Sequence, residues 1–451
     1  MSDTSKLKGP DFGGALAIPN RLRTLCTDLF EALRDASFDG VGISRETYGQ
    51  SETEAMEIVA EIATREGLAI DWDRARNLVI SLPGRNPDLP AVATGSHLDS
   101  VPVGGNYDGA AGVVAGLSAL IAAKQSGPAL RMMQLYALRG EESAWFDGPC
   151  YFGSRALFGK LTESDFAARH RAGKKTLADS MRETGADMAA LREGTPLIDP
   201  AALACWIELH IEQGPVLIAL DKPIGLVTGI RGNVRHRKIV CHGEAAHSGA
   251  VPRWLRHDAV LAMADLLVRL DEHWRVLLEW GEDLVLTSGI VETDPREHAL
   301  SRIPGTVSFA LEYRSQDMKT LTSFGKLIEM ECAEVASRRG VRFEMGASNL
   351  TDPARMSPAV IGLLEGSCDA LGVSHEIMPS GAGHDTSIFA NAGVPTGMIF
   401  VRNDKGSHNP DEAMDFDDFF RASAVLAHAL KTAANQPPAQ SEQSEQSEQI
   451  T

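Results

Sequence analysis

The fold is decided by AVATGSHLDSVPVGGNYDGAAGVVAGLSALIAAKQSG, residues 91–127. The apolar run 91–96 predicts a short strand, and the small-residue run 109–127 predicts a helix that ends at a glycine. A polar, glycine-rich loop joins the two. In α/β sheets, ligands bind beyond the carboxyl ends of the strands, so this loop lies where a functional site is expected.

The flanking sequence repeats the alternation of helices and strands. Amphipathic helices are predicted within residues 18–33 and 51–67, and apolar strands within 77–84 and 131–140. At 451 residues the chain is too long for one typical domain. We therefore predict an α/β fold, with a main domain built on a mixed sheet flanked by helices.

Residues 228–345 have a different rhythm, strand–helix–strand–strand–helix–strand, which is typical of a two-layer α/β sandwich. The predicted strands lie within 234–243, 284–293, 305–315 and 341–345, and the predicted helices within 257–274 and 321–340. We expect this sandwich to be inserted into a main domain formed by 19–227 and 346–434. Residues 1–18 and the repetitive tail 435–451 are predicted to be disordered.

The composition restricts the classes of partner. A formal net charge of −18 argues against nucleic acid or an anionic membrane as the main partner. The start has no apolar core followed by a small-residue cleavage site, so we expect no secretory signal, and no apolar run approaches the roughly 20 residues that span a bilayer. The six cysteines are scattered without a C-x-x-C pair, which favours reduced thiols and a cytoplasmic location.

Polar residues follow the predicted strand 91–96. His97 comes directly after the strand, Asp99 could hold its imidazole, and Asp108 lies among glycines just before the helix, where a carboxylate could bridge two cations. The alternative interpretation is that His97 and Asp99 are polar loop residues and that Asp108 caps the helix.

Glu141 and Glu142 follow the predicted strand within 131–140. In an irregular loop one side chain could bind a metal while the other holds a water as general base, and a cation would offset their repulsion. The alternative is an ordinary acidic helix start before SAWF.

Further candidates lie near other predicted strand ends and loops. His210 ends an apolar stretch, with Gln213 close by; His384 lies in GAGHDTSIFA, and His408 lies in KGSHNPDE. A single histidine is more often structural than a ligand, and the His408 loop could be an exposed turn.

Together the sequence offers a five-ligand set of nitrogen and oxygen donors: His97, Asp108, Glu142, His210 and His408. Such donors suit two borderline metals such as zinc, manganese or cobalt. Glu141 is left over and could take a proton from a water and pass it to a leaving nitrogen.

Six motifs in this order resemble those of the hydantoinase/carbamoylase family of dinuclear-metal amidohydrolases, which are related to the aminoacylases. They are GSHLDSVPVGGNYDGAAGV, RGEESAWF, ELHIEQGPVL, AHSGAVP, GAGHDTSIFA and SHNPDE, and the resemblance covers roughly residues 20–430. The family includes N-carbamoyl-L-amino-acid hydrolases, β-ureidopropionases and allantoate amidohydrolases.

The resemblance implies two divalent ions per subunit (zinc, manganese, cobalt or nickel). It implies His97, Asp108 and His210 around one ion and Asp108, Glu142 and His408 around the other, with Glu141 as general base. It also implies that the inserted segment is a lid and dimerisation domain of a homodimer. His247 would reach a reaction centre, commonly that of the partner subunit. Gln213, Arg314, Gly383 and His384 would contact a small substrate that carries a carboxylate.

The sequence departs from the family pattern on the inserted segment. Ser301 stands where an asparagine is usual, Arg302 follows it, and Arg253 and Trp254 follow AHSGAVP. We count Ser301 and Arg302 as candidate substrate contacts and expect a pocket altered for a larger, aromatic or dianionic substrate. The alternatives are that Arg314 forms a surface ion pair, that His247 is a turn residue, and that Trp254 and Trp274 pack within the lid.

The resulting expectation is hydrolysis of the C–N bond of an N-carbamoyl amino acid. Allantoate, another ureido acid, an N-acyl amino acid or a dipeptide amide are alternative substrates. A protein that binds a ligand without turnover is the alternative from another class.

Overall fold

The computed structural model describes residues 18–148 and 150–437, which form two compact units. The main unit comprises the described residues up to Thr228, Met356–Met378 and those from His384 onward; the inserted unit comprises Gly229–Arg355 and Pro379–Gly383. The disorder predicted for 1–18 and 435–451 concerns residues that lie outside the described part, apart from 18 and 435–437. No helix among the described residues combines the length and the hydropathy needed to cross a membrane.

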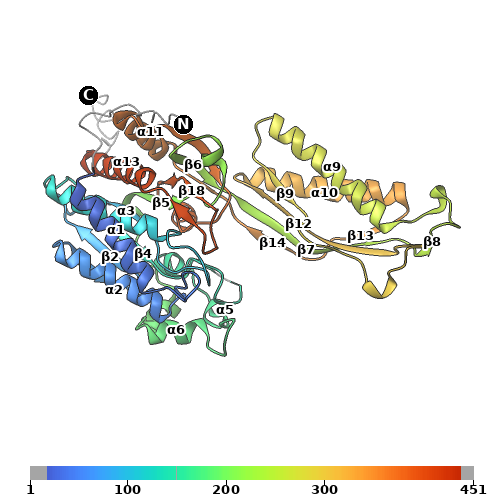
Figure 1. Ribbon diagram of the computed structural model, residues 1–451, viewed down its shortest axis with the longest axis horizontal. Helices are drawn as coiled ribbons and strands as arrows, with labels where there is room; N and C mark the ends of the chain where they lie inside the picture. The colour runs from blue at the N-terminus through green and yellow to red at the C-terminus, as the bar shows by residue number, and fades with distance from the viewer. Residues whose placement is uncertain (1–17, 149, 438–451) are drawn as a thin grey trace, which may run out of the picture. The chain divides into compact units, whose positions relative to one another are not determined.

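The main unit is built on a mixed sheet, and the predicted α/β class is confirmed (Figure 1). Among the described residues the strands follow the order β1-β2-β4-β3-β5-β17-β6-β15, with β16 also paired to β6. The central strands β4, β3, β5 and β17 are parallel. The bounds are β1 Ala69–Trp72, β2 Leu78–Leu82, β3 Ala91–His97, β4 Met133–Leu138, β5 Leu203–Ile211, β6 Ile224–Ile230, β15 Ala354–Arg355, β16 His375–Ser380 and β17 Thr396–Val401.

Helices flank this sheet (Figure 1). The longer ones are α1 Asn20–Asp35, α2 Gln50–Arg65, α3 Ala110–Gln125, α11 Pro358–Leu371 and α13 Phe416–Asn435. The shorter ones are α4 Phe152–Leu157, α5 Glu163–Phe166, α6 Leu177–Glu183, α7 Met188–Glu193, α8 Val216–Ala219 and α12 Thr386–Ala390. Two further short strands pair with each other, β18 Asn403–Asp404 and β19 Ala413–Met414.

Helix α3 packs directly on the sheet because its sequence is rich in small residues. A Cβ atom added at Gly112 would lie 2.2 Å from Leu209 O on β5, so this turn of the helix touches the strand backbone. Leu117 and Leu120 on α3 are completely buried, as is Leu426 on α13, in the same core. The close packing holds the start of α3, and the loop before it, against the carboxyl ends of β3 and β5.

The inserted unit is an antiparallel sheet with two helices. Its strands are β7 Gly232–His242, β9 Val285–Thr287, β10 Val291–Glu292, β12 Thr306–Ser315, β13 Arg342–Glu344 and β14 Ser348–Thr351, with a separate pair β8 Ala246–His247 and β11 Arg302–Ile303. Helices α9 Ala259–Glu279 and α10 Met318–Arg339 lie on one face of the sheet (Figure 1). Alternate residues of β12 are buried beneath them, from Val307 to Tyr313.

The prediction of one strand within 284–293 is wrong. The segment forms two short strands, β9 and β10, separated by residues 288–290. Ser288 Oγ donates to Ala310 O at 2.8 Å, so a side chain takes the carbonyl that a backbone N–H of a continuous ladder would bind.

Candidate metal centre

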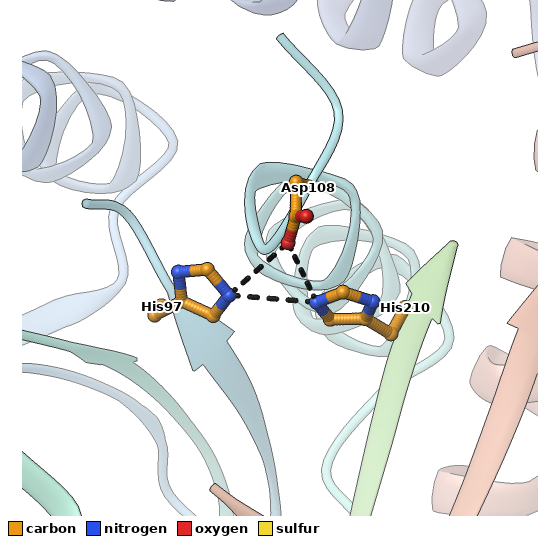
Figure 2. Close-up of side chains that lie close together, drawn as sticks. All are labelled: His97, Asp108 and His210. Carbon is orange, nitrogen blue, oxygen red and sulfur yellow. Dashed lines mark hydrogen bonds and ion pairs between the residues drawn. The ribbon is translucent and has the colours of Figure 1, made fainter. Parts of the chain in front are cut away.

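Three side chains converge where β3, β5 and α3 meet. His97 is the last residue of β3, His210 lies near the end of β5, and Asp108 lies just before α3 (Figure 2). Asp108 Oδ1 is 3.4 Å from His97 Nε2 and 3.1 Å from His210 Nε2, and the two nitrogens are 3.4 Å apart. All three residues are buried, and because His97 belongs to β3, the interpretation of His97 as a polar loop residue is wrong. The helix-cap interpretation of Asp108 is also wrong, because the N-cap of α3 is Gly109.

The second nitrogen of each imidazole fixes the tautomer. His97 Nδ1 lies 3.0 Å from Asp99 O, and His210 Nδ1 lies 2.9 Å from Ile211 O. A carbonyl oxygen only accepts, so each Nδ1 carries a proton and, in the neutral ring, each Nε2 keeps a lone pair, which in His210 also accepts from Gly109 N at 3.2 Å. Asp108 Oδ1 is buried and has no hydrogen-bond partner among the described residues. Two lone pairs and an unpaired carboxylate oxygen form a donor set that fits a divalent cation.

The shifted pKa values of His97 and Asp108 also favour a bound cation. Burial opposes a charged imidazolium, yet Asp108 and Asp99 raise the pKa of His97 well above its ordinary value. Burial alone would raise the pKa of Asp108, but His210 and the other histidines hold it well below the usual range. A site that favours positive charge on its nitrogens and negative charge on its oxygen also favours a metal ion.

A second group shares Asp108. His408 Nε2 lies 3.5 Å from Asp108 Oδ2 and 3.3 Å from Glu142 Oε1. These contacts raise the pKa of His408 to about 10. The His408 side chain is 51% exposed and has a φ of +60°, so it does lie in an exposed turn, but its ring reaches both carboxylates. The two oxygens of Asp108 therefore face two different groups, as a bridging ligand would.

A third group of potential ligands, Glu208, His210 and His384, has a different character. Glu208 Oε1 accepts from Ser96 Oγ at 2.9 Å, and Oε2 accepts from the N–H and the hydroxyl of Thr386 at 3.0 and 2.6 Å. Because the Glu208 carboxylate already accepts three hydrogen bonds, it serves as a structural connection between β3, β5 and α12. No motif or spacing in the sequence distinguishes Glu208, although it lies two residues before His210 on the same strand face.

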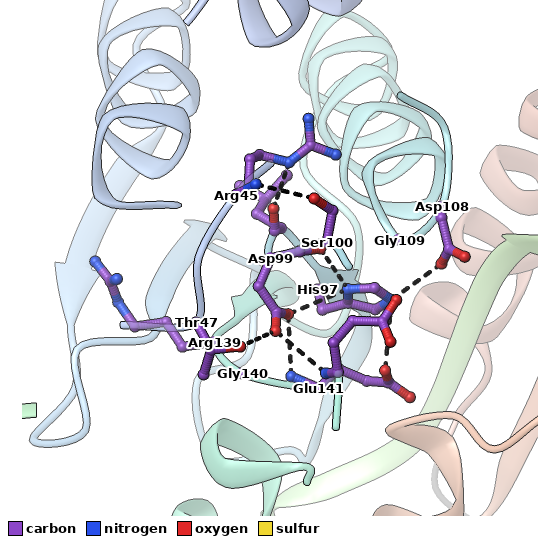
Figure 3. A network of polar contacts seen from close by, with 12 residues as sticks. Arg45, Thr47, His97, Asp99, Ser100, Asp108, Gly109, Arg139, Gly140 and Glu141 are labelled. Carbon is purple, nitrogen blue, oxygen red and sulfur yellow. Dashed lines mark hydrogen bonds and ion pairs between the residues drawn. The ribbon is translucent and has the colours of Figure 1, made fainter. Parts of the chain in front are cut away.

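The loop that carries Glu141 and Glu142 is fixed through its N–H groups. Asp99 accepts from both glutamates and also contacts His97 Nδ1, so one carboxylate orders both sides of the site (Figure 3). Four consecutive backbone N–H groups donate hydrogen bonds to side chains: Arg139 to Asn77 Oδ1 (3.0 Å), Gly140 to Glu52 Oε1 (2.9 Å), Glu141 to Asp99 Oδ1 (3.0 Å) and Glu142 to Asp99 Oδ2 (3.2 Å).

The carbonyl groups of the same loop are also paired. Tyr151, Phe152 and Gly153 donate their N–H groups to the carbonyls of residues 141, 140 and 139 at 3.2, 2.8 and 2.8 Å. These hydrogen bonds satisfy backbone N–H groups at the start of α4 that have no partner within the helix. Because α4 begins only at Phe152, the interpretation of the two glutamates as a helix start is wrong. The adjacent carboxylates occur together because the backbone that carries them is held on both sides.

Glu141 has the environment of a general base. Burial, and then the charges of Glu142 and Asp385, raise its pKa well above the usual range in spite of the nearby His97. Its Oε2 is 4.0 Å from His97 Nε2, farther than the groups that surround Asp108. A carboxylate whose pKa is raised accepts a proton more readily, as a general base must.

The other predicted substrate contacts of the main unit lie close to these groups. Gln213 Nε2 donates to Asp108 Oδ2 at 2.7 Å, and its Oε1 is buried without a hydrogen-bond partner among the described residues. His384 is buried, with ring centroids 4.5 Å from His210 and 5.6 Å from Phe400. Burial and the neighbouring His210 lower the pKa of His384 well below its ordinary value, so the ring is neutral.

The predicted contacts on the inserted unit fall into two places. His247 and Arg302 are cross-strand partners on β8 and β11, and Ser301 directly precedes β11. Arg314 lies at the other end of β12, roughly 26 Å along the strand from Thr306. These two places are therefore too far apart within one chain to contact the same small molecule.

The contacts of Arg314, His247 and the tryptophans test whether these residues have only structural roles. Arg314 pairs with Glu312 at 2.9 Å and donates to Gly381 O at 2.9 Å, two residues before Gly383. His247 Nδ1 accepts from Gly249 N at 3.1 Å, which is the predicted turn contact. Trp274 Nε1 donates to Leu284 O at 2.7 Å within the unit. The packing interpretation of Trp254 is wrong for the isolated chain, because Trp254 is 80% exposed.

Asp385, beside His384, is a buried carboxyl group, and only one of its two oxygens has a hydrogen-bond partner among the described residues. Its Oδ1 accepts from Ser154 Oγ at 2.5 Å, whereas Oδ2 has no hydrogen-bond partner among the described residues. Burial, and then the negative charge of Glu208, raise the pKa of Asp385 to about 7. The folded chain therefore holds a proton here that the unfolded chain loses at lower pH.

Asp385→Asn is expected to stabilise the metal-free protein at pH 8 relative to wild type. In the unfolded chain the Asp385 carboxyl has a pKa of about 3.9. Between about pH 4 and 7 the folded state therefore binds more protons than the unfolded state. The free energy of unfolding of wild type falls as pH rises through this range, by up to about 1.4 kcal/mol per pH unit. Urea unfolding at pH 5 and pH 8, followed by tryptophan fluorescence, measures the difference. The exposed Asp369→Asn is the matched control. An unchanged pH dependence in Asp385→Asn would contradict the assignment.

The chain is similar to known hydrolases along most of its length. The model of peptidase family M20/M25/M40 matches residues 93–432. The N-carbamoyl-L-amino-acid amidohydrolase of Paenarthrobacter aurescens is 32% identical over 397 residues, which cover 88% of this chain and 94% of that protein. The allantoate amidohydrolase of Escherichia coli (strain K12) is 30% identical over 391 residues, which cover 86% of this chain and 92% of that protein.

Solved structures share the fold. A crystal structure of an amidase of the hydantoinase/carbamoylase family from Burkholderia multivorans matches with a TM-score of 0.80 and 26% sequence identity, and the match covers 93% of this chain and 98% of that chain. The family match includes the whole stretch from His97 to Glu412. The groups around Asp108 therefore lie inside the matched region.

Proposed function

Since the chain belongs to peptidase family M20/M25/M40, as the resemblance of its motifs predicted, we propose that it is a metal-dependent amidohydrolase that cleaves the C–N bond of an N-carbamoyl (ureido) amino acid. The observation that carries the proposal is the convergence of His97 Nε2 and His210 Nε2 on an unpaired oxygen of Asp108, with Glu141 alongside. The similarity to an N-carbamoyl-L-amino-acid amidohydrolase supports the substrate class.

The proposed cofactor is a pair of divalent cations per chain. His97, Asp108 and His210 would hold one, and Asp108, Glu142 and His408 the other. When bound, such cations polarise a carbonyl group and lower the pKa of water. Zinc, manganese, cobalt and nickel all accept these nitrogen and oxygen donors.

The side chains around the cations then have separate tasks. Glu141 accepts the proton of the attacking water and passes it to the leaving nitrogen. For an N-carbamoyl substrate the products are ammonia, carbon dioxide and the amino acid. Gln213 has a buried amide oxygen that is available to a substrate N–H, which supports its role as a substrate contact. His384, a neutral ring, and Gly383 are proposed to contact substrate as well.

The inserted unit is proposed to act as a lid and to join two subunits into a homodimer. We assign His247 to the stabilisation of the oxyanion and Arg314 to the substrate carboxylate, which a guanidinium can bind through two hydrogen bonds. His247 on β8 and Arg314 at the far end of β12 are too far apart to contact one substrate within one chain, which supports assigning His247 to the partner subunit's reaction centre. A cytoplasmic location belongs to the same proposal.

Allantoate or another ureido acid is the second candidate substrate. The similarity to an allantoate amidohydrolase favours it. Arg302 favours an altered pocket, because it is the cross-strand partner of His247 and adds a positive charge beside it. In this structure its guanidinium lies 3.3 Å from the Glu297 carboxylate. A substrate with a second anionic group would be accommodated by this change.

Parallel measurement of ammonia and amine release tests the proposal. Metal-reloaded protein would be offered N-carbamoyl-L-amino acids, N-carbamoyl-β-alanine, allantoate, N-acetyl amino acids and dipeptide amides. Ammonia from a carbamoyl or ureido substrate is the expected result. Amine release without ammonia would instead assign the protein to acyl-amide hydrolysis, and metal binding without turnover of any substrate would favour a binding protein.

A further inference from the structure

Glu412 is a buried carboxylate that connects the loop carrying Asp108 to the loop carrying His408; only 7% of its surface is exposed. Its Oε1 accepts hydrogen bonds from the backbone N–H groups of Tyr107 at 2.8 Å and Asp108 at 3.3 Å. Its Oε2 accepts from Ser407 Oγ at 2.7 Å. One side chain therefore contacts both loops at the residues that carry or precede the candidate ligands.

Ser407 extends the connection to the side chain of Asp108. Its hydroxyl also lies within hydrogen-bonding distance of Asp108 Oδ2, the oxygen that faces His408. The next residue is His408, whose side chain is half exposed and whose φ is +60°. Because packing does not hold the exposed side chain of His408, its loop is fixed relative to Asp108 by the contacts of Ser407 with Asp108 and with Glu412.

The Asp108 loop is shaped to receive this carboxylate. A Cβ atom added at Gly105 would lie 2.2 Å from Glu412 Cδ and Oε1, so the carboxylate rests against the glycine backbone. Arg45 is fully buried and donates to Leu98 O at 2.6 Å and Asn106 Oδ1 at 3.3 Å within the same loop. Its positive charge interacts favourably with Glu412.

We propose that Glu412 is a positioning residue that holds Asp108 and the His408 loop at the separation that the ligand group Asp108, Glu142 and His408 requires. This inference rests on the proposed function. His97 and His210 depend on Glu412 less, because each ring is held through Nδ1 by a backbone carbonyl. Removing a partner that orients a ligand typically costs about 10- to 100-fold in metal affinity.

Titration of the metal-stripped full-length protein with Mn²⁺, by isothermal calorimetry, tests the inference. Wild type is expected to bind two equivalents. Glu412→Ala is expected to keep one of them and to bind the other about 10- to 100-fold more weakly. Glu412→Gln keeps an oxygen that can accept from the two N–H groups and is expected to recover most of the lost affinity. Gly105→Ala displaces the carboxylate without changing it and should resemble Glu412→Ala.

The control is Asp165→Ala. Asp165 is an equally buried carboxylate of the main unit, paired with Arg155 at 2.6 Å, and its loss should lower the Tm of the metal-free protein while both Mn²⁺ affinities are retained. Two equivalents bound to Glu412→Ala with wild-type affinities, or an equal loss at both, would overturn the inference and leave the proposed function standing. A wild-type protein that binds no Mn²⁺ would overturn both.

Discussion

Glutamine in place of Glu141 is expected to lower kcat by about 100- to 10,000-fold, the range that a general acid–base group contributes, while both metal ions stay bound. The amide cannot accept a proton from water. Glu141 belongs to none of the groups of converging metal-ligand atoms, and its Oε2 lies 4.0 Å from His97 Nε2, so it is not required as a ligand. The measurement is kcat on the best carbamoyl substrate together with metal content by mass spectrometry.

The matched control is the neighbouring substitution, Glu142→Gln. It removes a charged oxygen that lies 3.3 Å from His408 Nε2, so it is expected to lower metal content along with activity. The two glutamates are adjacent in sequence and share Asp99 as backbone partner, so a general disturbance of the loop would affect both variants alike. Loss of metal in Glu141→Gln, or activity close to wild type, would contradict the assigned role.

Asp108→Asn is expected to abolish activity and to weaken binding of both metal ions by more than about 100-fold, because a shared ligand is lost. Asp108 is the only negative charge in the group with His97 and His210, and its second oxygen belongs to the group with His408. The amide keeps the shape but not the charge. Metal content after dialysis against a weak chelator measures the effect.

The exposed Asp369→Asn on α11 serves as the control for this substitution, because it changes the same charge on the same unit. Retention of two ions by Asp108→Asn would show that Asp108 does not bridge. Loss of one ion only would show that it belongs to a single group.

The sequence was informative where function depends on strand ends. His97 and His210 could be predicted as site residues because each follows a continuous apolar run, and parallel neighbouring strands bring their carboxyl ends together. The helix after Asp108 was recognisable from its small residues. Glu141, Glu142 and His408 were candidates because they lie after a predicted strand or in a polar loop, and the resemblance to family motifs then implied their roles.

The residues that hold this site were not predictable in the same way. Glu52 accepts from the N–H of Gly140, Asn77 from that of Arg139, and Glu412, which ends the SHNPDE motif without having been assigned a role, from that of Asp108. Each is an acceptor on another element whose partner is a backbone group, so no spacing in the sequence marks it. The same reason explains the interrupted strand within 284–293, where the hydroxyl of Ser288 binds a backbone carbonyl.

The proposed hydrolysis depends on two ions at the groups that share Asp108. The most direct test is the rate of ammonia release from an N-carbamoyl-L-amino acid, measured on metal-stripped protein against equivalents of added Mn²⁺ or Zn²⁺. We expect no release without metal and a rise that reaches its plateau at two equivalents per chain. Release that is independent of added metal, or no release at any loading from any carbamoyl or ureido substrate, would contradict the account.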